Sequence, residues 1–264
     1  MFVDSTSAPR ATVAENMRVY ILNIGFMECD ANNVVAGTVV GTKSMPTPVT
    51  KWIKIPSYAV LIEHPERRIL FDLGVNPATI HPPEVLDLFP YYCNENQRIE
   101  NQLALVGLRP EDVSTVVLSH LHFDHCGNIH LFDHADIYFN PLELTANPNI
   151  PPSVSIKKPH SVEADMEIVP GVQVITLRGH TAGLIGLVVR LKDDGTLVFT
   201  SDAIYAMGNY GPPARPSGAV YDSLAYYESI EKVRRLEATD RAKVMFSHDM
   251  EFFETMKKAP DYYK

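Results

Sequence analysis

Cysteine is scarce in this chain of 264 residues, and the few cysteines form no pattern. Cys29, Cys93 and Cys126 are odd in number, stand far apart and include no Cys-x-x-Cys pair. A disulfide framework needs an even set, and a thiolate zinc site needs closely spaced pairs, so neither is predicted. The scarcity of cysteine instead favours a reducing compartment, and we expect a cytoplasmic protein.

Long apolar runs are also missing from the sequence. Residues 1–17 lack an apolar stretch behind basic residues, which argues against a secretory leader. No apolar run approaches the roughly 20 residues that span a membrane. We therefore expect a soluble protein with no membrane partner.

Positive charge is in short supply as well. The chain has 23 basic against 32 acidic residues, a formal net charge of -9, and no block of Lys and Arg. Binding to a phosphate backbone needs a basic patch, so nucleic acid is not an expected partner. The hydrophobic content of 45% suits a substantial core, and the length favours one domain over residues 1–264.

Alternating apolar residues and turn signals predict a chain rich in short strands. The predicted strands cover residues 18–24, 33–40, 58–63, 68–72, 113–118, 172–177, 184–191, 196–200 and 243–246. Helical spacing predicts a helix over 95–106 and another through Tyr226, Ile230, Val233 and Leu236, capped by Asp222. The proline-rich start of segment 147–161 excludes a regular helix or a central strand there, and leaves a lid, a linker or an ordinary surface loop.

The most informative motif is the run from His120 to His125, which follows the apolar strand predicted at 113–118. It places three imidazoles and a carboxylate in six consecutive positions, as His120, His122, Asp124 and His125. Imidazole is the commonest protein ligand for transition metals, whereas calcium and magnesium prefer shells made only of oxygen. Adjacent ionisable groups at a strand end are costly unless something pairs them, so the run predicts a metal-binding loop.

Three further residues of ligand type follow predicted strands: His180, Asp202 and His248. Taken singly, each is more simply a loop or capping residue. If their strands run in the same direction, however, their ends meet at one edge and the side chains share a cleft. One zinc needs only three or four protein ligands, so seven candidates indicate two metals, with Asp202 as the natural bridge.

This ordered set of ligands resembles the metallo-β-lactamase superfamily. Within it the chain is most similar to the N-acyl-homoserine lactonases, because Tyr205 follows Asp202 by three residues and the segment Asn209–Arg215 also resembles theirs. The resemblance implies an α/β fold of the αββα sandwich type, two packed mixed sheets flanked by helices. It assigns His120, His122 and His180 to one metal, and Asp124, His125 and His248 to the other. It also admits a homodimer.

The two cations are expected to be Zn²⁺, although the same ligands accept iron, cobalt or manganese. Paired divalent cations lower the pKa of bound water, so that a hydroxide nucleophile exists at neutral pH. The expected substrate is therefore a small electrophile such as a lactone. Tyr205 would donate a hydrogen bond to the oxyanion, and Asp124 would return a proton to the leaving ring oxygen. Without the resemblance, Tyr205 is more simply a core residue. Phe26 and Met27 are candidates for the acyl-chain groove, with core packing as the equal alternative.

Other activities on the same fold stay open at this point. A hydrolase of pyridoxolactone, aryl esters or organophosphates would use the same centre, and the run Ser247–Met250 resembles the end of pyridoxolactonase. A diiron redox enzyme is a different class, but such proteins typically carry glutamate in place of the second histidine, which here is His122, and add a flavin domain. We therefore expect a metal-dependent lactonase that opens the ring of N-acyl-homoserine lactones by attack of a bridging hydroxide.

Overall fold

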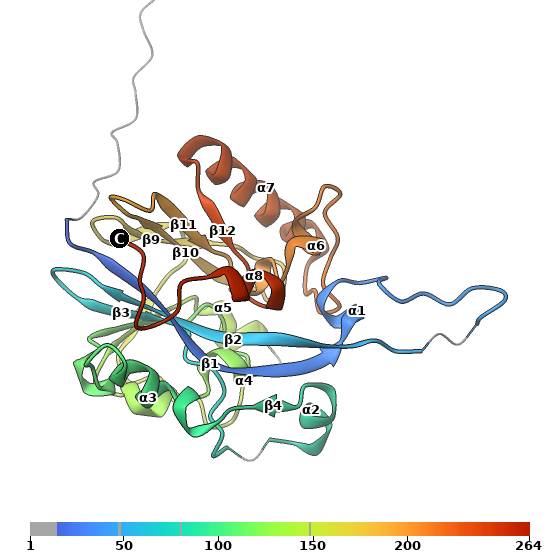
Figure 1. Cartoon of the computed structure of the whole chain (residues 1–264), viewed down its shortest axis with the longest axis horizontal. Helices are drawn as coiled ribbons and strands as arrows, with labels where there is room; N and C mark the ends of the chain where they lie inside the picture. The colour runs from blue at the N-terminus through green and yellow to red at the C-terminus, as the bar shows by residue number, and fades with distance from the viewer. Residues whose placement is uncertain (1–14, 47–48, 80, 148) are drawn as a thin grey trace, which may run out of the picture.

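Two β-sheets pack face to face, with helices on their outer faces (Figure 1). The computed structural model describes residues 15–46, 49–79, 81–147 and 149–264. The predicted αββα sandwich is confirmed, with both sheets mixed. No helix in these ranges is both long enough and apolar enough to cross a membrane.

The first sheet has seven strands and contains a parallel centre. Its strands, in spatial order, are β4 (Tyr91–Tyr92), β1 (Arg18–Asp30), β2 (Trp52–Glu63), β3 (Arg68–Phe71), β5 (Thr115–Val117), β6 (Asp136–Phe139) and β7 (Pro159–Ser161). Strands β3, β5 and β6 run parallel to one another. The residues that follow β3 and β5 therefore emerge at the same edge of the sheet.

The second sheet has five strands, and three of them share one direction. Its spatial order is β12 (Lys243–Met245), β11 (Thr196–Phe199), β10 (Ile185–Arg190), β9 (Val172–Thr176) and β8 (Met166–Val169). Strand β10 is antiparallel to both β9 and β11, while β12 is parallel to β11. Strands β9, β11 and β12 therefore end at one edge, as the sequence analysis required for a shared cleft.

The helices are short, apart from one. They are α1 (Ala31–Val34), α2 (Pro83–Leu88), α3 (Ile99–Ala104), α4 (Phe123–Cys126), α5 (Leu142–Ala146), α6 (Met207–Tyr210), α7 (Ser223–Asp240) and α8 (Met250–Thr255). Short 3₁₀ turns cover Glu95–Gln97, Pro110–Asp112, Ile129–Phe132 and Ser201–Ala203. The predicted cap of α7 is confirmed, because the Asp222 side chain accepts from the N–H groups of Leu224 and Ala225.

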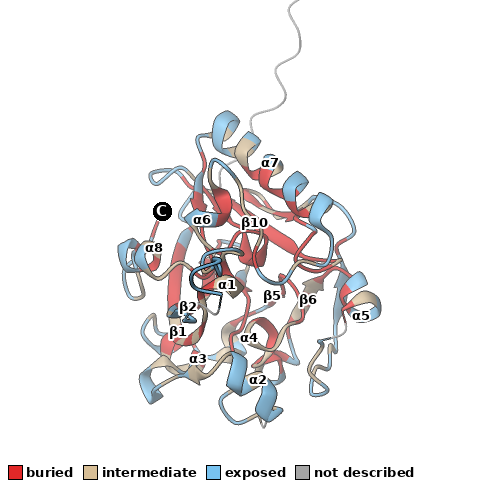
Figure 2. Cartoon of the chain, turned by 90° about the vertical axis from the view of Figure 1, so that its right-hand side faces the viewer, coloured by how far each residue is buried: buried red, intermediate tan, exposed pale blue. Residues whose placement is uncertain are grey.

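The core lies between the sheets and under the helices. Ile21 and Val60 of the first sheet share a fully buried cluster with Val174 and Leu187 of the second. Helix α3 covers the outer face of the first sheet, and α7 covers that of the second. Figure 2 shows the same layering, with burial concentrated in the strands and exposure on the outer sides of the helices.

Two predicted elements differ from the structure. The strand expected at 33–40 is wrong: β1 extends instead to Asp30, whose side chain accepts from the Asn32 N–H and caps α1. The helix expected at 95–106 is split, because Arg98 adopts an extended conformation (φ -60°, ψ 141°) between a 3₁₀ turn and α3. A side-chain cap in the first place, and an extended residue in the second, interrupt the element that the apolar pattern predicts.

Candidate metal centre

The ends of strands from both sheets converge on one cluster of imidazoles and carboxylates. His120 lies beyond β5 of the first sheet, whereas His180, Asp202 and His248 lie beyond β9, β11 and β12 of the second. All seven residues predicted as ligands fall into two groups that share Asp202. The first group is His120, His122, His180 and Asp202, and the second is Asp124, His125, Asp202 and His248.

In the first group, three imidazole nitrogens face one another. His122 Nδ1 lies 3.0 Å from His120 Nε2 and 3.0 Å from His180 Nε2. Burial, reinforced by the neighbouring imidazoles, lowers the pKa of His120 well below its usual value and that of His122 to about 3. The rings of His120 and His122 are therefore neutral, and a neutral imidazole offers the lone pair that a metal needs.

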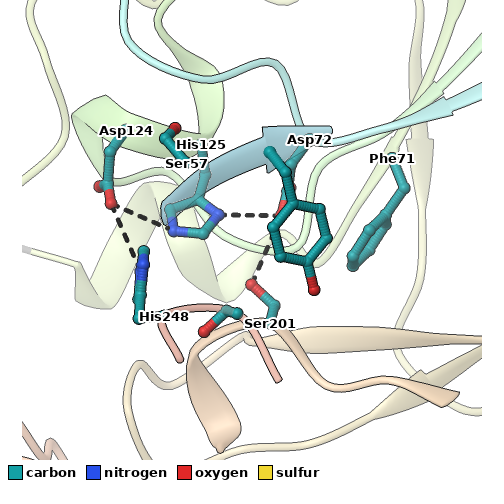
Figure 3. Close-up of a pocket in the computed structure, with 9 residues that line it drawn as sticks. Ser57, Phe71, Asp72, Asp124, His125, Ser201 and His248 are labelled. Carbon is teal, nitrogen blue, oxygen red and sulfur yellow. Dashed lines mark hydrogen bonds and ion pairs between the residues drawn. The ribbon is translucent and has the colours of Figure 1, made fainter. Parts of the chain in front are cut away.

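The second group places two imidazoles against two carboxylates. His125 Nε2 lies 3.4 Å from Asp124 Oδ2 and 3.2 Å from Asp202 Oδ1, while His248 Nε2 lies 3.1 Å from Asp202 Oδ1. Burial opposes ionisation of Asp202, but the imidazoles of His125 and His248 hold its pKa well below its usual value. Figure 3 shows His125 and His248 both directed towards Asp124.

Asp202 faces the two groups with different oxygens. Its Oδ2 lies 3.6 Å from His120 Nε2 and 3.4 Å from His180 Nε2, whereas Oδ1 faces His125 and His248. This division of one carboxylate between two sets of ligand atoms is the arrangement that a bridging aspartate requires.

The polar atoms of the cluster are arranged to bind two metal ions rather than to satisfy one another. Among the described residues, the buried atoms His125 Nε2 and Asp202 Oδ1 make no hydrogen bond, a costly state for polar atoms. Four zinc ligands at about 2.0–2.1 Å lie roughly 3.3 Å from one another, and the donor atoms of the two groups lie within 4.8 Å of one another. A mixed imidazole and carboxylate set suits zinc, iron, cobalt or manganese. The residues present therefore fit a dinuclear centre.

The other ring nitrogens fix the orientation of the imidazoles. Nδ1 of His180 donates to the Ala219 carbonyl at 2.9 Å, and Nδ1 of His248 donates to the Pro56 carbonyl at 3.0 Å. His125 Nδ1 lies 2.8 Å from Asp72 Oδ2. Such outer partners set the tautomer and aim the opposite nitrogen at the metal.

Asp72 is a functional residue that the sequence analysis missed. It is buried directly after β3, and it accepts from both the N–H and the hydroxyl of Ser119 at 2.8 Å, as well as from His125. The signal was present, because Asp72 ends an apolar strand just as Asp202 does. It points at His125 and at the Ser119 backbone, so it orients a candidate ligand and is not itself a ligand.

A cavity of about 610 Å³ opens above the cluster. His122, Asp124 and His180 lie at its base, and Met27 contributes to its wall. Phe26 does not line this cavity: it stacks on Tyr92, with ring centroids 4.9 Å apart. Successive side chains of a strand point to opposite faces, so Phe26 and Met27 cannot both face the same groove.

Most of the cavity wall comes from segments without predicted structure. Val85 and Leu88 of α2, Phe89 and residues 149–153 of the proline-rich segment all line the cavity. That segment therefore lines the cavity rather than linking two distant parts. Sequence patterns did not identify the residues of α2, because a single short helix gives no clear periodicity.

Tyr205 stands between the two groups, at the side of the cavity. Its ring packs against His180 and His248, with centroids 5.6 and 4.9 Å away. The hydroxyl lies 3.5 Å from His180 Nδ1, which is already bonded to the Ala219 carbonyl. Burial first, and then the nearby carboxylates of Asp202 and Asp124, raise the pKa of this phenol well above its usual value. Tyr205 is therefore a protonated hydrogen-bond donor.

Comparison with known proteins gives one consistent family. The chain is 30% identical over 269 residues to the N-acyl homoserine lactonase AiiB of Agrobacterium fabrum, covering 92% of this chain and 98% of that protein. It is 29% identical over 225 residues to an N-acyl homoserine lactonase of Bacillus cereus, covering 80% of this chain and 88% of that protein.

Solved structures agree with the sequence comparison. An N-acyl homoserine lactone hydrolase with N-hexanoyl-L-homoserine bound at its catalytic metal centre matches with a TM-score of 0.82 and 26% identity, covering 96% of this chain and 100% of that one. A mutant of B. thuringiensis AiiA with N-decanoyl-L-homoserine bound matches with a TM-score of 0.82 and 25% identity, with the same coverage. The family model of the metallo-beta-lactamase superfamily matches residues 53–248, and with the fold and the clustered ligands this establishes that the chain belongs to that superfamily.

Proposed function

We propose that this protein is a single-domain, dinuclear-metal hydrolase that opens the lactone ring of N-acyl-homoserine lactones. The observation that carries the proposal is the protonated Tyr205 hydroxyl beside a two-metal ligand set at the base of an apolar cavity. The relatives named N-acyl homoserine lactonase, and the related structure with N-hexanoyl-L-homoserine at its metal centre, support the substrate class.

The metal ions would be held by His120, His122 and His180 on one side and by Asp124, His125 and His248 on the other, with Asp202 shared. Two divalent cations bound there supply a hydroxide nucleophile near neutral pH and an electrophilic contact for a carbonyl oxygen. We propose Zn²⁺, because a borderline cation suits this mixture of imidazole and carboxylate.

Tyr205 stabilises the charge that develops on the lactone carbonyl oxygen. Its pKa is raised by burial and by Asp202, so the O–H stays available as a donor throughout the reaction. A donor fixed in a site that excludes water stabilises an oxyanion more than water does, because it needs no reorganisation.

Asp124 transfers a proton from the nucleophile to the leaving ring oxygen. Burial opposes its ionisation, but His125 and His248 lower its pKa, so its carboxylate can accept a proton as the nucleophile forms. Attack on the carbonyl carbon forms the new carbon–oxygen bond and places negative charge on the carbonyl oxygen, and the bond from that carbon to the ring oxygen then breaks. Asp124 then delivers the proton to the departing ring oxygen, and the product is the ring-opened hydroxy acid.

The apolar wall of the cavity binds the acyl chain. Val85, Leu88, Phe89, Ile150 and Pro151 are among the apolar residues that line the cavity. Burial of an alkyl chain contributes about 0.8 kcal/mol per methylene group, so this wall favours acylated over bare homoserine lactone.

The test is a proton-release assay with the metal-loaded protein over N-acyl-homoserine lactones of different acyl length. Pyridoxolactone, aryl esters and phosphotriesters serve as the comparison panel. We expect the highest kcat/KM on the acyl-homoserine lactones. Turnover confined to the comparison panel would refute the proposed substrate and favour another hydrolase of this fold.

We also infer a reducing, cytoplasmic setting, which the free state of Cys29, Cys93 and Cys126 supports. One domain is supported by the core cluster that the two sheets share. A homodimer stays a prediction, which sedimentation or light scattering at several protein concentrations would check.

A further inference from the structure

Glu143 is a fully buried carboxylate that lies outside the ligand set. It belongs to α5 and is 0% exposed. Among the described residues, no Lys, Arg or His lies within ion-pair distance of it, and it accepts only from N–H groups. Burying a carboxylate without a countercharge costs free energy, so the position of Glu143 indicates a specific role.

Three N–H donors converge on this carboxylate. The backbone N–H of Leu121 donates to Oε2 at 3.1 Å, and the backbone N–H of Gly183 donates to Oε1 at 2.9 Å. The side-chain amide of Asn147 donates to Oε2 at 2.9 Å. Hydrogen bonds to an ionised acceptor are about twice as strong as neutral ones.

The donors come from three segments that surround the first metal group. Leu121 stands between His120 and His122, and Gly183 lies three residues after His180. Asn147 begins the segment whose residues 149–153 line the cavity. A single carboxylate thus ties together both ligand loops of one metal site and the adjacent wall.

The contact with Gly183 depends on the absence of a side chain there. A Cβ at this position would lie 2.9 Å from Glu143 Oε1 and 3.0 Å from its Cγ. Glycine therefore allows the carboxylate to reach the backbone of the His180 loop, and any larger residue would displace it.

We propose that Glu143 is the positioning residue of the first metal site. It touches neither substrate nor metal, and acts by holding the backbones of the two loops so that the nitrogens of His120, His122 and His180 converge. The proposal rests on the dinuclear centre of the proposed function, and is independent of which substrate is hydrolysed.

The test is metal affinity measured by competition with a chromophoric chelator, for each of two zinc equivalents. Glu143→Gln keeps the volume but offers one acceptor oxygen for three donors, so at least one loop is released. We expect one equivalent to bind roughly 10- to 100-fold more weakly and the other to change by less than about threefold. Gly183→Ala displaces the carboxylate without removing it, and should weaken binding of the same zinc equivalent. It serves as the test variant if Glu143→Gln does not fold.

Gln102→Leu is the matched control for a general loss of buried hydrogen bonds. Gln102 is buried in α3 and holds the Asn23 N–H and the Asn96 carbonyl, away from the ligand loops. We expect it to lower the Tm and leave both zinc affinities unchanged. In a His180→Ala background, which already lacks a first-site ligand, Glu143→Gln should not weaken the remaining zinc.

The outcomes separate the inference from the proposed substrate. Equal weakening of both equivalents, or unchanged affinities with a lower Tm as in Gln102→Leu, would overturn the role of Glu143. A chain that responds as expected in metal affinity but hydrolyses no acyl-homoserine lactone refutes only the substrate. Binding of fewer than two zinc ions by the unsubstituted chain overturns the dinuclear centre and the role of Glu143 together.

Discussion

Replacing Tyr205 with phenylalanine removes one hydroxyl and little else. The ring keeps its packing against His180 and His248, and Cys29, Val34 and Ile55 belong to the same buried cluster. The hydroxyl contributes only a 3.5 Å contact with a nitrogen that already has a partner. The free energy of unfolding should therefore change by less than about 1 kcal/mol.

The catalytic cost of the same change should be much larger. Loss of one donor to a developing oxyanion typically lowers kcat by up to about 10³-fold, and a partly compensated loss by about 10-fold. Since each tenfold change corresponds to about 1.4 kcal/mol, Tyr205→Phe should cost roughly 1.4–4 kcal/mol in transition-state free energy. We expect this loss in kcat, with metal content and KM nearly unchanged, because the hydroxyl acts on charge that is absent from the ground state.

Tyr226→Phe is the matched control for this experiment. Tyr226 is fully buried, and its hydroxyl makes one 3.5 Å contact with the Arg215 carbonyl, yet it does not line the cavity. Steady-state proton release and elemental analysis on both variants give kcat, KM and metal content. An unchanged kcat in Tyr205→Phe, or an equal fall in Tyr226→Phe, would show that the phenol does not stabilise the oxyanion.

Three further predictions test the bridge, the His180 loop and the acyl-chain wall. Asp202→Asn should lower the occupancy of both metals together, and loss of only one by elemental analysis would contradict a bridging carboxylate. Gly179→Ala should lower the free energy of unfolding in urea by about 3 kcal/mol or more. The reason is that Gly179 has φ +136° and that a Cβ there would lie 2.3 Å from Tyr226 Cα. An unfolding midpoint within error of the parent would refute this steric argument. Val85→Trp should raise the KM for dodecanoyl-homoserine lactone roughly tenfold more than for the butanoyl compound, and equal changes would place the acyl chain elsewhere.

The ligands were predictable from the sequence because they obey one local rule. Each of His120, His180, Asp202 and His248 follows an apolar strand, and β9, β11 and β12 run in the same direction. Local patterns identify the strands, and the number and order of ligand-type residues select those that belong together. The prediction needed no knowledge of side-chain packing.

The supporting residues and the wall follow no such rule. Asp72 ends a strand as the ligands do, but only the structure reveals that it points at Ser119 and His125. Glu143 lies in a five-residue helix, where its neighbours give no sign that two distant loops donate to it. Helix α2 and residues 149–153 come to line one cavity only in the folded chain, so the shape of the cavity depends on an arrangement that no single segment encodes.

The charges of these residues explain why the centre calls for divalent cations. Asp72, Glu143 and Asp202 are buried, and the Asp124 side chain is 10% exposed. No lysine or arginine in the described ranges lies within ion-pair distance of any of the four. The surrounding carboxylates raise the pKa values of His125 and His248 against the opposing effect of burial, and protons on both rings would balance only two of the four negative charges. Two divalent cations carry four positive charges, so binding them neutralises the four carboxylates, displaces those protons and stabilises the fold that holds the ligands in place.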